Sequence, residues 1–140
     1  MTPFPYRLVE PIGTKGTLGL IVLQTDETIE QDFRRLFADP EVALYVSRIP
    51  SGAEITPETI AEMEAELPRA ASLFPSAAAF DVIAYACTSG TTLIGADRVA
   101  ALVAAQATTS AVTNPLTAAF AALEALGASS LAIVSPYVAS

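Results

Sequence analysis

The residue whose chemistry stands out is the one cysteine of the chain, Cys87, which is followed by Thr88, Ser89 and Gly90. These residues come directly after residues 80–86, an apolar run that predicts a buried strand. At a strand-to-helix turn, backbone N–H groups and the helix dipole favour the thiolate, the nucleophilic form of cysteine. The hydroxyl and N–H groups that follow can hold a carboxylate. The pattern indicates a reactive thiol beside an anion-binding loop.

A buried, inert cysteine is the alternative, because unpaired cysteines often pack as small hydrophobic side chains. The residues around Cys87 favour neither interpretation by themselves.

Polar residues also follow other expected strands, namely Asp26, Asn114 and Tyr137. Ligands of open parallel sheets bind beyond the carboxyl ends of the strands, so these residues are candidate ligand contacts. Asp26 is better explained as a helix N-cap, whereas capping and ligand binding explain Asn114 equally well. Tyr137 is either a terminal surface residue or a phenol that donates to a bound oxyanion. With Thr88 and Ser89, these residues form the candidate substrate-binding set.

Composition excludes several classes of function. Fifteen acidic against seven basic residues give a net charge of −8, which argues against nucleic-acid binding. The single lysine, Lys15, excludes a polybasic membrane-binding patch. Without histidine, and with one cysteine, the chain lacks the commonest base, the commonest metal ligand and every Ser-His-Asp triad. No apolar stretch reaches the roughly 20 residues of a membrane-spanning helix, and the N-terminus does not resemble a signal peptide. We therefore expect a soluble, cytoplasmic protein.

Apolar runs alternate with amphipathic segments along the 140 residues. Helix starts are marked by Thr56-Pro57 and Asn114-Pro115, and a kink or break is expected at Pro68. The expected strands are 18–23, 42–49, 80–86, 108–112 and 130–134. The expected helices are 26–38, one from 57 onwards, 96–106 and 115–126.

This order predicts a three-layer α/β fold, with a mostly parallel, doubly wound sheet between two layers of helices. The chain ends soon after its fifth expected strand, which leaves that strand without a covering helix. We therefore expect the N-terminal part of a longer protein, or one that borrows the missing part from a partner, so a homo-oligomer stays open. In domain terms, 1–127 forms one α/β domain and 128–140 begins a second, truncated one.

Three segments together resemble the maleate isomerase and arylmalonate decarboxylase branch of the aspartate/glutamate racemase superfamily. They are Gly19–Val22 with Gln24–Thr28, Ala86–Gly90, and Ser135–Tyr137. The resemblance covers nearly all of this chain but only about the first half of such proteins. It implies the racemase-like fold for 1–127, with no metal or organic cofactor. It also implies that Cys87 is a nucleophile or base and that Thr88, Ser89 and Tyr137 hold the substrate carboxylate, with Asn114 near the loop that lines the site.

Three departures from the family pattern matter. The second catalytic cysteine of two-cysteine relatives lies in a second half that this chain lacks. Asp26 stands where isomerases and racemases usually have asparagine, and its charge would repel a dicarboxylate unless the carboxyl is protonated or paired. Leu23-Gln24 replaces the Pro-Pro of decarboxylating relatives.

The expected function is a cofactor-independent, cysteine-based isomerase or racemase of a small carboxylate, similar to maleate isomerase. A decarboxylase of the arylmalonate type, or an ectoine-catabolism protein of the same branch, is one alternative. A non-catalytic module that binds small acids is another.

Overall fold

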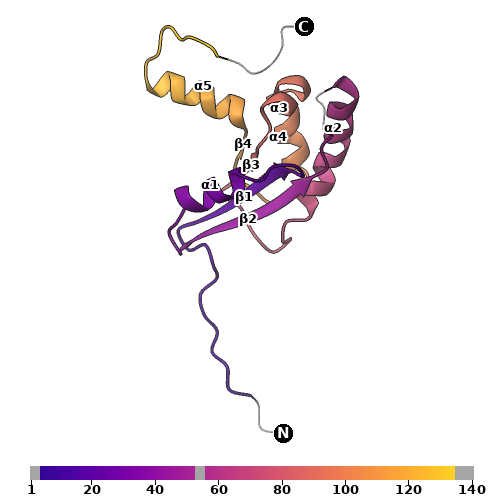
Figure 1. Ribbon diagram of the computed structural model, residues 1–140. Helices are drawn as coiled ribbons and strands as arrows, with labels where there is room; N and C mark the ends of the chain where they lie inside the picture. The colour runs from indigo at the N-terminus through magenta and orange to yellow at the C-terminus, as the bar shows by residue number, and fades with distance from the viewer. Residues whose placement is uncertain (1–3, 53–55, 135–140) are drawn as a thin grey trace.

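A parallel sheet of four strands forms the centre of the protein (Figure 1). The computed structural model describes residues 4–52 and 56–134. The strands are β1 (Gly16–Leu23), β2 (Val42–Ile49), β3 (Val82–Tyr85) and β4 (Val112–Thr113), in the order β2-β1-β3-β4. All three pairings are parallel, which confirms the predicted α/β fold.

Five helices connect or follow the strands. They are α1 (Ile29–Leu36), α2 (Pro57–Ser72), α3 (Thr88–Ile94), α4 (Ala96–Ala104) and α5 (Pro115–Ala125). Both proline-marked starts are confirmed: Thr56 caps α2 and Asn114 caps α5, each within a capping box.

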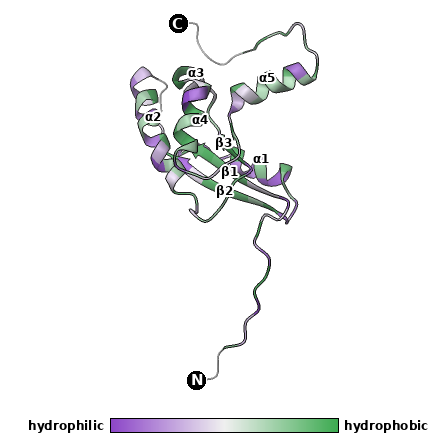
Figure 2. Cartoon of the chain, turned by 180° about the vertical axis from the view of Figure 1, so that it is seen from behind, coloured by the Kyte–Doolittle hydropathy of each residue, from purple (hydrophilic) through white to green (hydrophobic). Residues whose placement is uncertain are grey.

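The main hydrophobic core lies between one face of the sheet and α2 and α4. Side chains alternate across a strand, so Ile83 and Tyr85 of β3 point to the same face, and both are fully buried. They belong to one cluster with Met63 and Leu67 of α2 and Val99 of α4. Apolar residues dominate the central strands in Figure 2. The interior strand β1, with Leu20, Ile21 and Val22 all at 0% exposure, is buried on both faces as its continuous apolar run predicts.

Helix α2 continues through Pro68, so the expected break is wrong. A proline lacks the N–H that a helix interior uses, but here the buried face of α2 continues past it with Ala70 and Ala71. The hydroxyl of Ser47 on β2 donates to the carbonyl oxygen of Ala70 at 2.7 Å. Packing and this bond hold the last turn of α2 against the sheet.

The sequence prediction was also wrong at three other places. Residues 88–94 form a helix, α3, that was not expected. The fourth strand is Val112–Thr113 instead of 108–112, preceded by an isolated bridge between Phe80 and Thr109. Residues 130–134 form no strand, and Leu131, Ile133 and Val134 are exposed. An apolar run becomes a strand only where a neighbouring strand accepts its hydrogen bonds, and no described strand does so here. The domain boundary at 127/128 stays a prediction.

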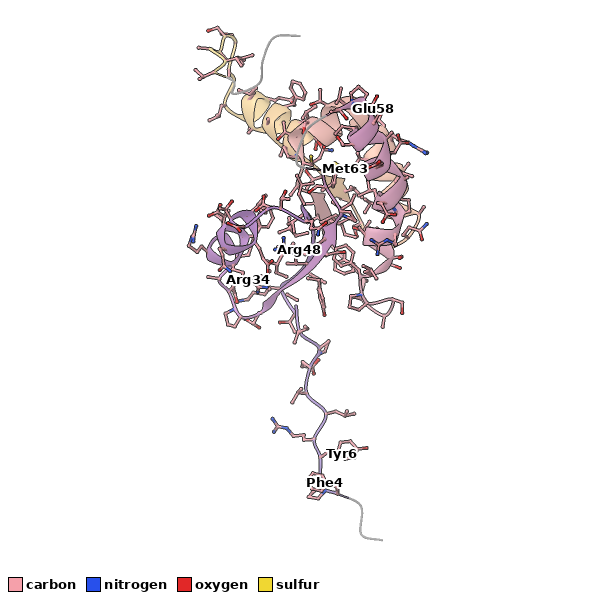
Figure 3. All side chains as sticks on the ribbon, turned by 45° about the vertical axis from the view of Figure 1, so that its right-hand side comes forward. Phe4, Tyr6, Arg34, Arg48, Glu58 and Met63 are labelled. Carbon is pink, nitrogen blue, oxygen red and sulfur yellow. The ribbon has the colours of Figure 1, made fainter. Side chains whose placement is uncertain are left out.

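Two regions lie outside the core. Helix α5 contains no buried residue and extends from the end of β4 (Figure 1). The N-terminal segment that carries Phe4 and Tyr6 runs away from the sheet as irregular chain (Figure 3). Within the described ranges, no helix is both long and apolar enough to span a membrane.

Candidate functional site

The sheet order brings three candidate segments to one edge. Strand β3 pairs with β1 on one side, with Ile21 opposite Tyr85, and with β4 on the other, with Ala84 opposite Thr113. Because the strands are parallel, their carboxyl ends meet at the same edge. The loop after β3 therefore lies between the β1–α1 loop and the start of α5.

Cys87 is placed at the junction of β3 and α3, as the N-cap of the helix. Its sulfur accepts the N–H of Gly90 at 3.2 Å and lies 3.7 Å from the hydroxyl oxygen of Ser89. The residue is only 5% exposed and adjoins the main core. The largely buried sulfur therefore has one backbone N–H donor and one hydroxyl group beside it, so its surroundings are not purely apolar.

Thr88 and Ser89 form the first turn of α3 instead of a loop. Thr88 is exposed and Ser89 is half-buried. The hydroxyl of Thr91, one turn further on, donates to the carbonyl oxygen of Cys87 at 2.6 Å, and this fully buried side chain fixes the junction. Both predicted carboxylate-binding residues thus adjoin Cys87 in sequence and structure, and the role itself stays a prediction.

Tyr85 is a neighbour of Cys87 that sequence analysis missed. Its side chain is fully buried, and its hydroxyl has no hydrogen-bond partner among the described residues. Burial and, after it, the charge of the neighbouring Cys87 raise the pKa of this phenol, so it stays protonated at neutral pH. The signal was present in the two-residue spacing, because alternate residues of a strand share a face.

Gly90 faces both of these groups. A Cβ atom built on Gly90 would lie 2.6 Å from the hydroxyl oxygen of Tyr85 and 2.9 Å from the sulfur of Cys87. Any larger residue would collide with both, so glycine keeps the phenol and the sulfur close to one point.

Asp26 acts as a cap at the start of α1. Its Oδ1 accepts the N–H groups of Thr28 and Ile29 at 2.8 and 2.9 Å. Asp26 therefore caps the helix, although it lies two residues before the N-cap residue, Thr28. One carboxylate oxygen is thus already used by the backbone, and a role in substrate binding stays a prediction.

Arg48, at the end of β2, organises the loop that carries Asp26 (Figure 3). Its Nη1 donates to the carbonyl oxygens of Leu23, Gln24 and Asp26 at 3.1, 3.4 and 2.9 Å. Its Nη2 pairs with Glu30 at 3.2 Å. Sequence analysis assigned this arginine no contacts, because a contact with three carbonyl groups across the sheet leaves no trace in local spacing.

Asn114 is buried, with 3% exposure, and caps α5. Its Oδ1 accepts the N–H groups of Leu116 and Thr117 at 3.1 and 3.0 Å, and the hydroxyl of Thr117 accepts the N–H of Asn114 in return. Capping therefore accounts for the residue type, and the predicted binding role is left as a prediction. Tyr137, the remaining candidate, lies outside the described residues.

A small pocket of about 210 Å³ opens at the same edge of the sheet. Its floor includes Tyr85, Ala86 and Asn114 at the ends of β3 and β4. Its walls are mostly apolar and include Ile29 and Phe33 of α1 and Ala118 of α5. No cluster of three or more metal-ligating side chains occurs in the parts of the chain that the structure covers.

Neither family models nor curated proteins match this chain. Solved structures do. The maleate cis-trans isomerase of Nocardia farcinica, bound to TRIS, matches with a TM-score of 0.66 and 28% identity over 80% of this chain and 49% of its own. The maleate isomerase Iso of Pseudomonas putida S16 matches with a TM-score of 0.62 and 25% identity over 80% of this chain and 50% of its own. The chain therefore spans about half the length of the enzymes it matches.

These likenesses confirm the resemblance that the sequence indicates. The parallel α/β sheet of this chain belongs to a fold that it shares with these maleate isomerases. This chain therefore has the fold of the maleate isomerase branch of the aspartate/glutamate racemase superfamily, over about half the length of such an enzyme.

Proposed function

We propose that this chain carries the thiol of a cofactor-independent isomerase acting on a small carboxylate, with maleate as the first substrate to test. The observation that carries the proposal is the position of Cys87. It lies at the carboxyl edge of the central sheet, in a maleate isomerase fold, with Gly90 N–H and the Ser89 hydroxyl at its sulfur.

The proposed chemistry is reversible addition to a carbon–carbon double bond. The Cys87 thiolate forms a C–S bond with one alkene carbon, and the π-electron pair moves toward the carboxylate on the other carbon. The former double bond is now single and rotates. Return of the electron pair expels the sulfur and restores the alkene with the opposite geometry. No oxidant, metal or net proton is consumed.

Fixed donors explain how the intermediate is stabilised. Negative charge grows on the substrate carboxylate as the C–S bond forms, and hydrogen-bond donors placed there in advance lower the barrier. We assign this role to the hydroxyls of Thr88 and Ser89 and to Tyr137. Racemisation would need a further acid or base, and we assign this role to none of the described residues.

Asp26 limits the choice of substrate. Its carboxylate accepts two N–H groups, and these contacts offset only part of the repulsion that a dicarboxylate would meet. A monocarboxylate substrate would meet less repulsion at this loop. For this reason the proposal names a small carboxylate as the class and maleate as one member of it.

The test is turnover followed by proton NMR, with maleate and a panel of small unsaturated acids. The proposal predicts a new isomer signal with the unchanged protein and none with Cys87→Ser, which keeps a capping group at the junction. Full activity in that variant would reject Cys87 as the nucleophile. An absence of turnover with every acid would reject the isomerase assignment.

A non-catalytic acid-binding module is the second candidate, favoured by the 5% exposure of Cys87. It predicts that a small acid raises the melting temperature of the unchanged protein and of Cys87→Ser equally, with no product formed. No observation specifically favours the decarboxylase or the ectoine-related alternative. Adding a malonate to the same substrate panel tests the decarboxylase.

A further inference from the structure

The β3–α3 junction holds two features that are unfavourable for stability. The hydroxyl of Tyr85 is buried without a hydrogen-bond partner in the part of the chain described, and such a group costs about 1–3 kcal/mol. Gly90 lies within α3, where glycine costs roughly 0.5–1 kcal/mol relative to alanine. A phenylalanine at 85 would fill the same space without the first cost. Both features therefore call for an explanation beyond packing.

Their geometry points to the sulfur of Cys87. Tyr85 ends β3 and Cys87 follows two residues later as the N-cap of α3, and both belong to the main core cluster. One point, the Cβ position of Gly90, lies within 2.9 Å of both the phenol oxygen and the sulfur. The absence of a side chain at Gly90 leaves room for both groups around this point.

We propose that Tyr85 is a positioning residue for Cys87, and that its phenol O–H turns to the sulfur and donates a hydrogen bond when the thiol ionises. The thiolate then has the phenol as a donor in addition to Gly90 N–H and Ser89. With the neutral thiol, which is a weak acceptor, the phenol stays unpartnered. This inference rests on the proposed function, because only a reacting thiol has a use for a stabilised charged form.

The phenol is a suitable donor because it keeps its proton. Burial and the charge of Cys87 both raise the pKa of Tyr85, so the phenol does not compete with the thiol for ionisation at neutral pH. A donor held in a low-dielectric interior is also stronger than one in water.

On the described residues of α3 and of the helices packed against it, no charged group takes over this role. Helix α3 has no acidic or basic residue in its first or last turn. On the packed helices, Glu64 pairs with Arg98 and Glu66 pairs with Arg69, so these charges are engaged at the surface. The remaining charged residues on α2, α4 and α5 are exposed: Glu58, Glu62, Asp97 and Glu124.

The experiment measures the rate of Cys87 alkylation by iodoacetamide between pH 5 and 10 in the unchanged protein and in Tyr85→Phe. The inference predicts that the midpoint of the pH profile rises by about one unit in the variant, which corresponds to a tenfold lower acid dissociation constant of the thiol. Tyr45→Phe, the same change at a tyrosine packed against Phe80, is the matched control and should leave the midpoint unchanged. A midpoint that moves by less than about 0.2 units in folded Tyr85→Phe, as judged by circular dichroism, overturns the inference.

The unchanged protein gives a second readout that needs no folded variant. With tyrosine labelled by ¹³C at Cζ, the Tyr85 signal should shift with the same midpoint as the alkylation of Cys87. A Tyr85 signal that stays constant while the thiol ionises overturns the inference. Neither readout uses a substrate, so a protein without isomerase activity can still pass this test, and an active isomerase can fail it.

Discussion

Two strand-to-helix junctions of this protein have the same form and different caps. At the end of β4, Asn114 caps α5 through its amide oxygen, with two N–H groups at 3.0–3.1 Å. At the end of β3, Cys87 caps α3 through its sulfur, with one N–H at 3.2 Å. Asparagine is among the preferred N-cap residues, whereas cysteine is not one of them.

The difference agrees with the proposal that Cys87 is the reacting residue. Capping alone accounts for Asn114, and it would select serine or aspartate at position 87. The surroundings differ as well, since α3 adjoins the main core while α5 buries none of its residues. Cysteine at the buried junction, flanked by Tyr85 and Gly90, is what reaction with a substrate would require.

The largest effect is expected from filling the space beside the sulfur. Gly90→Ala places a methyl group against the Tyr85 hydroxyl and the Cys87 sulfur, which should lower the free energy of unfolding by about 1–3 kcal/mol. Urea unfolding measures this. Gly16→Ala is the control, because the nearest atom to its added methyl lies 3.8 Å away. Equal stability of the two variants would show that the junction is loosely packed.

Removing the amide cap should have a smaller and more local effect. Asn114→Ala should destabilise α5 by about 1 kcal/mol, seen as faster hydrogen exchange in 115–125 with little change in the urea midpoint. Thr56→Ala removes the corresponding cap from α2, whose buried face joins the core, and should lower the urea midpoint. Asn114→Asp keeps the capping oxygen and is the control. A drop in the urea midpoint for Asn114→Ala as large as that for Thr56→Ala would mean that α5 and the core unfold together.

Exchanging the sulfur cap for a hydroxyl should change stability least among the substitutions. In Cys87→Ser the new oxygen can accept the N–H of Gly90, so the free energy of unfolding should stay within about 0.5 kcal/mol of the original. Cys87→Ala, which removes the cap, should be the less stable of the two in the same urea assay. The opposite order would mean that the sulfur serves packing and does not cap.

Alkaline pH changes stability without any substitution. The folded-state pKa of Tyr85 is raised above its unfolded value of about 10, so its contribution to stability is complete below pH 10 and is lost as the pH rises. The loss is about 0.4 kcal/mol at pH 10 and grows toward about 1.4 kcal/mol per pH unit above it. Urea unfolding of the unchanged protein at pH 9, 10 and 11 should show this loss, and Tyr85→Phe should show less of it. Parallel curves for the two proteins would remove Tyr85 as the cause.

The sequence was informative where local signals agreed with tertiary packing. Thr56-Pro57 and Asn114-Pro115 marked two helix starts correctly, because a capping side chain followed by proline suits only that geometry. The cysteine at the carboxyl edge was placed from the apolar run before it. Helix α3 was missed, since Thr88–Thr92 has low helix propensity and is held by Thr91 and Cys87.

The other gaps have the same origin. An apolar run at 130–134 gives the same pattern whether or not a strand accepts its hydrogen bonds. The contacts of Tyr85 and Arg48 join residues through space, so their part in the site could be seen only in the folded chain.

The proposed function requires the Cys87 sulfur to lie within a site that recognises a carboxylate. Comparing alkylation by iodoacetate, which is a small carboxylate, with alkylation by neutral iodoacetamide tests this directly. We predict that the rate of alkylation by iodoacetate saturates with its concentration and falls when maleate is added. The ratio of the iodoacetate rate to the iodoacetamide rate should be higher for Cys87 than for free glutathione. A rate that does not saturate, a rate ratio equal to that of glutathione and no protection by any small acid would together contradict carboxylate recognition at Cys87.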